Sequence, residues 1–198
     1  MPYLAPWRSP LARNLYQHRN QPQARYLQLA TTDLEGKPSN RTIVFRGFVD
    51  HLPNSSNLLK FISDRRAAKI SHIQHQPWVE ACWYFPKTRE QFRISGKMLL
   101  VEAEHPNWSP MRQTTWQELS DQSRTQFSWS DPGQPLAQAP EHNQPPPSQA
   151  HPNFTLLLLD PWLVDRLELR HYPHHRSRYQ KSGEQPQPSL WHHHYLNP

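Results

Sequence analysis

The chain contains a short basic segment that could bind an anion. Arg65 and Arg66 follow an apolar, strand-like run, and Lys69 comes one turn later. Ser63 or Asp64 can cap a helix that starts here, which would place the cations near the positive end of the helix dipole. Cations are unfavourable there unless backbone N–H groups and basic side chains together hold an anion, and a phosphate is the natural candidate. A solvated basic helix start without any ligand is the alternative that these residues leave open.

Further polar side chains are spread over other predicted strands. Arg41 and Arg46 flank a run of β-branched and aromatic residues, which predicts a strand over residues 39–49. Gln91 opens a second strand, in which polar and apolar residues alternate. Each of these side chains could be an ordinary surface group, so their role depends on whether the fold brings them together.

The histidines do not favour a metal site. Near the end of the chain they occur at His171, His174, His175, His192, His193 and His194. Neighbouring residues of a strand point to opposite faces, whereas a metal needs its ligands on one face, so we expect no metal. The glycine-rich motifs of Rossmann proteins and P-loop NTPases and the nucleophile elbow of hydrolases are also absent from the sequence.

Composition bounds the class of protein. With 198 residues, 35% hydrophobic and 19% charged, the chain suits one domain over residues 1–198 with a core of its own. The 22 prolines against 5 glycines disfavour long helices and favour a loop-rich β or α+β chain. Residues 131–153 are rich in proline and polar residues, so we expect a surface loop there and not a linker between domains.

Charge and cysteine content indicate which ligands and which cell compartment suit the chain. The net charge of +6 permits nucleic-acid binding, but the basic residues are scattered, so an anionic small ligand explains a local cluster as well. No window is apolar enough to span a membrane, and residues 1–7 lack the order of a signal peptide. The single Cys82 excludes an intrachain disulfide. We therefore expect a cytoplasmic protein that does not bind a membrane.

The remaining pattern predicts short strands at hairpin distances. Helices are expected from Ser9, from Ser63 or Asp64, and from Ser109 to about Phe127. Strands are expected over residues 26–32, 39–49, 58–62, 78–85, 91–101, 154–159, 164–169, 177–180 and 190–196. Strands that follow one another so closely favour an antiparallel sheet curled into a barrel, with the helices outside.

The order of the candidate residues resembles that of the pyridoxamine 5'-phosphate oxidase family, the FMN-binding split β-barrel proteins, and in particular a divergent branch of it. An arginine opens a strand along the flavin, as Arg41 does, and a hydroxyl residue ends the next strand before a basic helix, as with Ser63 and Lys69. A glutamine opens the later long strand, as Gln91 does. Further matches in residues 25–198, outside the proline-rich loop, are Arg124, Ser128, Arg176, Tyr179, Trp191 and Pro198.

The resemblance implies a mainly β (α+β) fold, an antiparallel split β-barrel with a few flanking helices, and FMN as the cofactor. It also implies a homodimer with the flavin site at the subunit interface. The implied substrate is a small molecule, and phosphorylated molecules are among the candidates. The residues implied for cofactor binding are Arg41, Thr42, Ile43, Val44, Phe45, Ile62, Ser63, Lys69, Gln91 and Arg176. Those implied for the substrate are Arg46, Arg124, Ser128 and His174, and the catalytic residue stays unassigned.

Different groups of the implied residues would bind different parts of the flavin. Arg41, Ser63 and Lys69 would neutralise the phosphate, with Arg65 or Arg66 as helpers. The backbone of Thr42 to Phe45 would bind the edge of the isoalloxazine ring, and Gln91 and Arg176 would address its polar rim.

Several positions depart from the family's pattern. Ala68 stands where the first residue of a basic pair is expected, and Arg46 replaces a substrate-contacting lysine. Ser120 stands where a phosphate-binding tyrosine is expected, and Tyr172 stands in place of an arginine although His174 remains. The flavin half of the pattern is mostly kept, whereas the half that would bind pyridoxamine phosphate is mostly not.

Three classes of function follow. The first is an FMN-dependent oxidoreductase, similar to pyridoxamine/pyridoxine 5'-phosphate oxidase, whose substrate the sequence does not fix. The second is a non-catalytic FMN-binding protein. The third and least favoured is a basic β-barrel that stacks single-stranded nucleic acid on its tryptophans and tyrosines.

Overall fold

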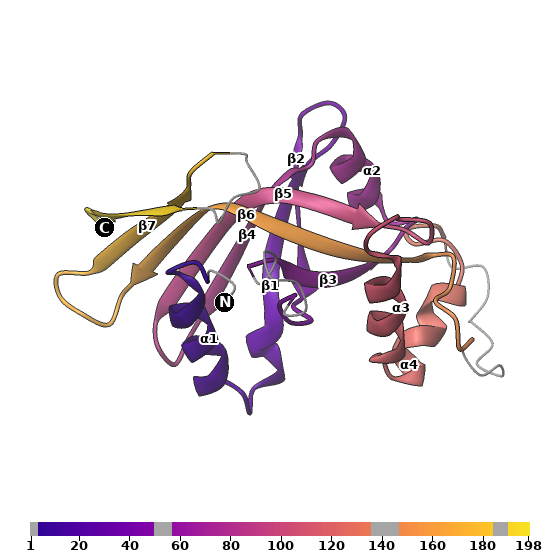
Figure 1. Ribbon diagram of the computed structural model, residues 1–198, viewed down its shortest axis with the longest axis horizontal. Coiled ribbons are helices and arrows are strands. Elements are labelled where there is room, and N and C mark those ends of the chain that lie inside the picture. The colour runs from indigo at the N-terminus through magenta and orange to yellow at the C-terminus, as the bar shows by residue number, and fades with distance from the viewer. Residues whose placement is uncertain (1–3, 50–56, 136–146, 184–189) are drawn as a thin grey trace.

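The structure, a computed structural model, describes residues 4–49, 57–135, 147–183 and 190–198. The helical elements are α1 (Arg8–Gln17), η1 (Pro22–Arg25), α2 (Ala68–His75), α3 (Ser109–Gln117), α4 (Asp121–Thr125) and η2 (Gln126–Ser128). The strands are β1 (Tyr26–Thr32), β2 (Pro38–Val44), β3 (Leu59–Asp64), β4 (Trp78–Phe85), β5 (Glu90–Val101), β6 (Phe154–Glu168), β7 (His175–Lys181) and β8 (Trp191–Leu196). These strands pair antiparallel throughout, which confirms the predicted fold class (Figure 1).

Six strands, β1 to β6, close into a barrel because β3 bridges β6 and the chain that follows β2. Hydrogen-bonded neighbours run β2-β1-β4-β5-β6-β7-β8, and β3 pairs with β6. On its other side β3 meets the chain that follows β2. There the Arg46 N–H donates to the Lys60 carbonyl at 2.9 Å, and the Lys60 N–H donates to the Gly47 carbonyl at 2.8 Å. β7 and β8 extend beyond the barrel, on the left in Figure 1.

The barrel splits along β6. Residues 154–159 of β6 pair with β3, and residues 163–168 pair with β7. We predicted two separate strands here, and this was wrong, because one strand of 15 residues runs through both halves. Pro161 has no N–H to donate, but it lies opposite Gly96 at a register shift where the ladder is already interrupted.

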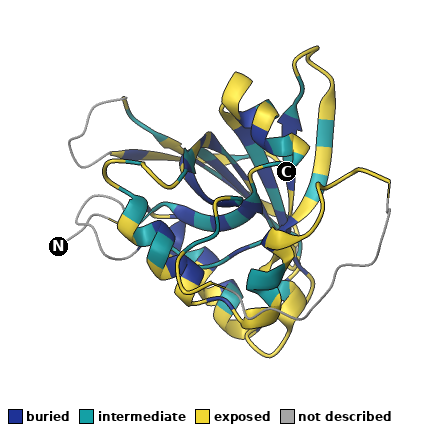
Figure 2. Cartoon of the chain, turned by 90° about the vertical axis from the view of Figure 1, so that its right-hand side faces the viewer, coloured by how far each residue is buried: buried dark blue, intermediate teal, exposed yellow. Residues whose placement is uncertain are grey.

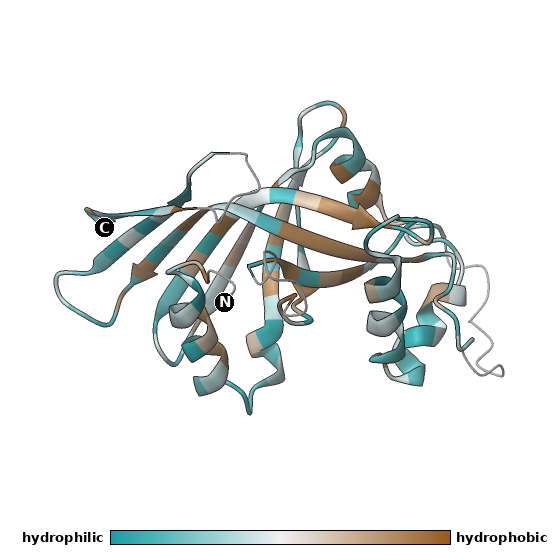
Figure 3. Cartoon of the chain, viewed as in Figure 1, coloured by the Kyte–Doolittle hydropathy of each residue, from teal (hydrophilic) through white to brown (hydrophobic). Residues whose placement is uncertain are grey.

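Aromatic side chains fill the barrel. Every second residue of β4 is buried, as expected for a strand with one face on the core. The rings of Phe45, Phe61, Trp83, Phe85 and Phe92 contact one another at centroid separations of 5.0 to 6.2 Å. Buried residues gather in the sheet and exposed ones on the turns and the outer faces of the helices (Figure 2), and β5 and β6 carry apolar stretches, coloured brown (Figure 3). The interior is therefore packed, and any binding site must lie outside it.

The basic segment begins its helix later than predicted. β3 continues through Asp64, and α2 starts only at Ala68. The Asp64 carboxylate accepts a hydrogen bond from the Arg66 N–H at 2.8 Å, so it closes a turn and does not cap the helix. Arg65 and Arg66 consequently lie in the turn before α2.

Two further elements differ from the prediction. The helix expected from Ser109 to Phe127 is divided into α3 and α4, because Ser120 leaves the helical conformation and its Oγ accepts from the Ser123 N–H. The strand expected over residues 39–49 ends at Val44, since the backbone beyond it turns to bond β3.

Parts of two predicted loops are not described. Residues 50–56, which include most of the turn expected before β3, and residues 136–146 of the proline-rich loop lie outside the described residues. The flanking residues 131–135 and 147–153 form turns and bends without helix or strand. Among the described residues, no helix has both the length and the apolar character needed to cross a bilayer.

Replacing Gly96 with alanine should destabilise the barrel. A Cβ atom there would lie 2.1 Å from the Asp160 carbonyl oxygen and 2.9 Å from the Pro161 Cα, both backbone atoms of β6. These atoms cannot move without shifting the ladder, so we expect a loss of about 3 kcal/mol in the free energy of unfolding, measured by urea denaturation. Gly36→Ala is the control: its φ is +80° but nothing lies within 4 Å, so only the left-handed backbone cost of about 1–2 kcal/mol applies. Equal losses in the two variants would contradict the close crossing of β5 and β6.

Candidate functional site

A pocket of about 460 Å³ opens on the outside of the barrel, beside β2, β3 and the start of α2. The residues that line it are Arg41, Thr42, Ile43, Val44, Arg46, Ile62, Ser63, Asp64, Ala67, Lys69, Gln126, Phe127, Trp129, Ser130 and Pro132. The structure therefore brings together most of the residues predicted for cofactor binding, from elements far apart in the sequence.

Arg41 is held in the pocket by neutral groups. Its guanidinium donates to the Leu29 carbonyl at 3.1 Å, to Thr31 Oγ1 at 2.7 Å and to Ser39 Oγ at 2.6 Å. No ion pair between described residues involves Arg41, and burial lowers its pKa. These hydrogen bonds fix the side chain but leave its positive charge without a carboxylate partner.

Lys69 lies beside Arg41, and its positive charge is also only partly compensated by a carboxylate. Its Nζ donates to Ser63 Oγ at 2.9 Å, and Ser63 is only 6% exposed. Burial, followed by the charge of Arg41, lowers the pKa of Lys69, and the Asp64 carboxylate opposes this in part. Asp64 is at the same time bound by Arg66, with contacts of 2.6 to 3.0 Å. Two cations therefore share one pocket wall, an arrangement that an anion would stabilise.

The strand that carries Arg41 lines the pocket along its length. Thr42, Ile43 and Val44 contribute to the lining. The side chain of Phe45 turns into the core instead, and its N–H donates to the Arg25 carbonyl at 2.8 Å. The backbone of Phe45 is thus partly committed to the fold, in contrast to the role predicted for it.

The opposite wall consists of residues that the sequence analysis missed. Gln126, Phe127, Trp129, Ser130 and Pro132 follow α4 and line the pocket. Only the nearby Arg124 and Ser128 pointed to this stretch, since aromatic residues after a short helix give no binding signal of their own. We call residues 126–132 the wall segment.

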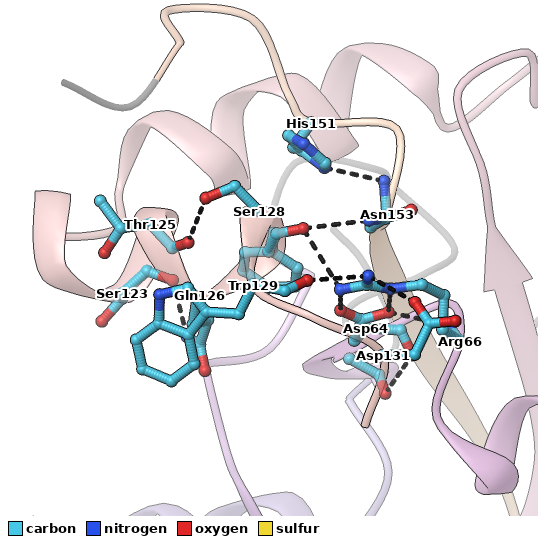
Figure 4. Close-up of polar contacts among 12 residues, drawn as sticks. Asp64, Arg66, Ser123, Thr125, Gln126, Ser128, Trp129, Asp131, His151 and Asn153 are labelled. Carbon is cyan, nitrogen blue, oxygen red and sulfur yellow. Dashed lines mark hydrogen bonds and ion pairs between the residues drawn. The ribbon is translucent and has the colours of Figure 1, made fainter. Parts of the chain in front are cut away.

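The two arginines suggested as phosphate helpers do not line the pocket. Arg66 binds Asp64, Asp131 and backbone carbonyls of the wall segment (Figure 4). The guanidinium of Arg65 is half exposed and lies 3.7 Å from Glu102. The suggestion that either arginine binds the anion directly is therefore not supported by their positions, because their charges are engaged elsewhere.

Gln91 and Arg176 lie at the other end of the barrel. Both pair with Leu167 of β6, whereas Ser63 pairs with Thr155 of the same strand. Twelve residues of extended chain span roughly 40 Å, so one chain does not bring these two groups to one small molecule. Arg176 meanwhile binds the Asp165 carboxylate at 2.9 to 3.2 Å, and this partner raises its pKa.

The predicted substrate residues are also divided. Arg46 lines the pocket, and burial and the charge of Arg25 lower its pKa. Arg124 and Ser128 flank the wall segment: Arg124 binds Asp121 at 2.5 Å, and Ser128 donates to the Thr125 carbonyl at 2.8 Å.

His174 lies in the turn between β6 and β7, where its Nδ1 contacts the His171 carbonyl at 2.8 Å. This places it at the far end, with Gln91 and Arg176. Within the described residues, no group of three or more His, Cys, Asp and Glu side chains is arranged to hold a metal ion.

Comparison with known proteins agrees with this geometry. A family model described as the FMN-binding domain of pyridoxamine 5'-phosphate oxidase matches residues 4–102, which is half of the chain. These residues include β1 to β5 and the cationic wall of the pocket. The chain belongs to this family.

The relationship extends beyond the matched half. Pyridoxine/pyridoxamine 5'-phosphate oxidase 2 of Arabidopsis thaliana is 36% identical over 173 residues, 85% of each chain. A pyridoxamine 5'-phosphate oxidase-related, FMN binding protein of Nostoc punctiforme superposes with a TM-score of 0.90 and 46% identity, over 99% of this chain and 100% of that one. PhzG of Burkholderia lata, at 19% identity and a TM-score of 0.75 over 98% of this chain and 94% of that one, shares the fold. The predicted membership of the pyridoxamine 5'-phosphate oxidase family is thus confirmed.

The charge of Lys69 can be tested directly. Its pKa should lie below the ordinary lysine value of about 10.4, and Arg41→Met should raise it, because the Arg41 charge is the second cause of the lowering. At pH values between the pKa of Lys69 in the folded chain and its higher pKa in the unfolded chain, the unfolded chain binds more protons. The contribution of Lys69 to stability therefore rises with pH in this range. Titration of the lysine side-chain signals by NMR measures the shift, and Arg25→Met is the control. An unchanged Lys69 pKa in Arg41→Met would show that the two cations do not interact.

Proposed function

We propose that this chain binds FMN noncovalently and acts as an FMN-dependent oxidoreductase on a small anionic molecule. The observation that carries the proposal is the cationic wall of Arg41, Ser63 and Lys69 in a pocket that strand β2 lines. The chain would act as a single domain, and its lone cysteine is compatible with the cytoplasm.

The donor set suits a phosphate monoester. Arg41 offers a fixed guanidinium, Lys69 a compact ammonium and Ser63 a hydroxyl within 2.9 Å of Lys69. Two positive charges match a group that carries about −1.5 to −2 charges at neutral pH. The free chain bears the cost of desolvating these cations, as the lowered pKa values of Arg41 and Lys69 indicate. A bound phosphate would remove that cost, which is why the site favours the phosphorylated flavin.

The rest of the pocket suits the flavin ring. Thr42, Ile43 and Val44 offer strand backbone and short side chains along one side, and Phe127 and Trp129 offer aromatic surface on the other. When bound, FMN supplies the hydride-transfer chemistry. The chain's own residues would bind and orient the cofactor and the substrate, so that the reacting atoms are held in the geometry that hydride transfer needs.

A second copy of the chain would complete the site. Gln91 and Arg176 share one end of the barrel, roughly 40 Å along β6 from Ser63. We propose a homodimer in which the Gln91 and Arg176 of one chain approach the Arg41 and Lys69 of the other. A cation beside the pyrimidine side of the ring would stabilise the reduced, anionic flavin.

An anionic substrate is supported by Arg46. This side chain lines the FMN pocket and also an adjoining pocket of about 480 Å³, whose lining includes Arg19 and Arg25 and, among the described residues, no Asp or Glu. The Arg46 Nε is buried without a hydrogen-bond partner in the described structure, and the Arg25 charge contributes to its lowered pKa. A carboxylate or phosphate of the substrate would satisfy both arginines.

A non-catalytic FMN-binding protein is the second candidate. Ser120, where a phosphate-binding tyrosine was expected, is used to cap α4. Tyr172, where an arginine was expected, is 97% exposed. Both positions weaken the expected binding of pyridoxamine phosphate without affecting the cofactor pocket.

Flavin affinity tests the phosphate site. Lys69→Ala and Arg41→Ala should each weaken FMN binding by about 1.5–3 kcal/mol, the range for hydrogen bonds to charged groups. Riboflavin, which lacks the phosphate, should bind poorly to the wild type and be affected little by either change. Quenching of flavin fluorescence measures the affinities, and Lys37→Ala, in the exposed turn after β1, is the control. Equal affinity of the wild type for riboflavin and FMN would refute the assignment.

Mixing two defective chains tests the shared site. Lys69→Ala and Arg176→Ala homodimers should each bind FMN weakly, because each lacks one part of both sites. A mixed dimer would hold one intact site and one doubly defective site, so subunit exchange should restore tight binding to a fraction of the sites. Sedimentation of the FMN-bound wild type should show a dimer. A flavin-saturated monomer, or no recovery after proven exchange, would contradict the proposal.

Turnover tests the substrate. Oxidation of pyridoxamine phosphate requires the phosphate of the substrate to be held while its reacting carbon lies at the flavin. Because Ser120 and Tyr172 remove two of the expected contacts, we expect weak or absent turnover by the FMN-loaded protein. Steady-state assays decide the matter: kcat/KM within the ordinary range of about 10⁴–10⁸ M⁻¹s⁻¹ would show that other residues compensate.

A further inference from the structure

Two groups of contacts between described residues attach the wall segment, residues 126–132, to the rest of the molecule. At its start, the Phe127 ring packs against Trp116 and Phe154, with centroid separations of 5.6 and 5.2 Å. The Phe127 carbonyl also accepts a hydrogen bond from Asn153 Nδ2 at 3.0 Å. This end belongs to a small buried cluster with a core of its own.

The later part of the wall segment is held by Arg66. One guanidinium nitrogen, Nη1, donates to the Trp129 carbonyl at 2.9 Å and to Asp131 Oδ1 at 2.8 Å. The other, Nη2, lies 3.4 Å from the Phe127 carbonyl. Figure 4 shows the Arg66 side chain and its dashed contacts with Trp129 and Asp131.

Arg66 is itself oriented by the end of β3. Asp64 accepts from Arg66 Nε at 3.0 Å, from Nη2 at 2.6 Å and from the Arg66 backbone N–H at 2.8 Å. These bonds raise the pKa of Arg66, Asp64 being the largest cause. Asp64 directly follows Ser63, so one ion pair connects the cationic wall of the pocket to the wall segment.

We propose that Arg66 is a positioning residue that holds Trp129 to Pro132 against the pocket and thereby sets how tightly flavin is retained. The proposal rests on FMN binding at this site, and it assigns Arg66 a role without contact to the phosphate. The fixed, forked donors of a guanidinium are needed, because a lysine ammonium cannot reach two carboxylates and two carbonyls in this geometry. Arg66 therefore acts on the whole flavin through the opposite wall, whereas Arg41 and Lys69 act on its phosphate.

This difference gives distinct signatures in flavin binding. A phosphate contact contributes to FMN and not to riboflavin, so its loss reduces the preference for FMN. A misplaced wall loses contacts common to both ligands, so its loss weakens both by the same factor and leaves the preference unchanged. The dissociation rate should rise with little change in the association rate, because the wall encloses a ligand that is already bound.

The experiment compares Arg66→Gln, Arg66→Lys and Arg65→Gln in the full chain, with FMN and riboflavin as probes. Arg65 is the matched control, since it is the neighbouring arginine and its guanidinium pairs outside the pocket. We expect Arg66→Gln to weaken both flavins by about tenfold, the equivalent of one lost hydrogen bond to a charged group. Arg66→Lys should not restore either affinity, and Arg65→Gln should match the wild type.

Two results would overturn the proposal. Wild-type affinity in Arg66→Gln would show that the wall does not depend on this side chain. Loss of FMN affinity alone, with riboflavin unaffected, would show that Arg66 contacts the phosphate directly. If Arg66→Gln does not fold, Asp131→Ala replaces it, because Asp131 is exposed and its removal leaves the Asp64–Arg66 pair intact. A two- to threefold faster release of FMN is then expected, and an unchanged rate would overturn the proposal.

Hydrogen exchange separates this inference from the proposed function. In the flavin-free chain, Arg66→Gln should speed amide exchange in residues 129–131 relative to Arg65→Gln, whether or not any flavin binds. If the wild type binds neither flavin, the proposed function fails and the role of Arg66 in retaining flavin fails with it. Faster exchange in that case would show that Arg66 holds the wall segment in place but has no role in binding flavin.

Discussion

The double pairing of β6 is the constraint on which the rest of the structure depends. β6 pairs with β5 along its length, and on its other side it pairs first with β3 and then with β7. The first pairing closes the barrel and places Ser63 beside β2, while the second sends β7 and its arginines away from it. The exchange takes place where Pro161 interrupts the ladder, and Gly96 is required because the Asp160 carbonyl lies too close for any side chain. One interrupted strand thus determines both the closed core and the separation of Arg176 from Lys69.

Hydrogen bonds fix cationic side chains that line the pocket, whereas the barrel interior behind it is filled by packed apolar side chains. Arg41 is fixed by three neutral acceptors and Lys69 by one hydroxyl. Such bonds orient the cations without neutralising them, so their charges stay available at a cost in desolvation. Carboxylates are directed elsewhere: Asp64 orients Arg66, and Asp165 binds Arg176 and Arg178. Within this pocket, the division separates Arg66, whose charge is paired and holds the fold, from Arg41 and Lys69, whose charges could hold a ligand.

Ser120, one of the departures from the family's pattern, has a physical reason in the structure. Ser120 serves as a helix cap, so the change from the expected tyrosine supports the break between α3 and α4. Ser120 and Tyr172 lie on the expected substrate side, whereas Arg41, Ser63 and Lys69 of the proposed phosphate site follow the family's order and only Ala68 departs from it there. We therefore expect the cofactor site and the substrate site to have diverged from the family's pattern to different extents.

The sequence by itself determined the local elements and the class of fold. The almost unbroken apolar run of residues 78–85 predicted β4 almost to the residue. The alternation that begins at Gln91 did the same for β5, because a strand with one buried face leaves a period of two in its side chains. The order of Arg41, Ser63, Lys69 and Gln91 was enough to predict the family. It could not predict that residues 154–168 form one strand, since Pro161 is tolerated inside that strand only where β5 and β6 change register.

Only the tertiary structure decided which cations are available to a ligand. Arg65, Arg66 and Lys69 look alike in sequence, yet Arg66 is used by Asp64 and Asp131, Arg65 lies outside the pocket, and Lys69 lines it. The wall segment was equally invisible in the sequence, because it is held at the pocket by contacts with Arg66 and Asn153, more than 20 residues away in the chain. Charge is a property of the residue and can be counted from the sequence. Whether that charge is compensated depends on distances between segments, and these are fixed only when the barrel closes.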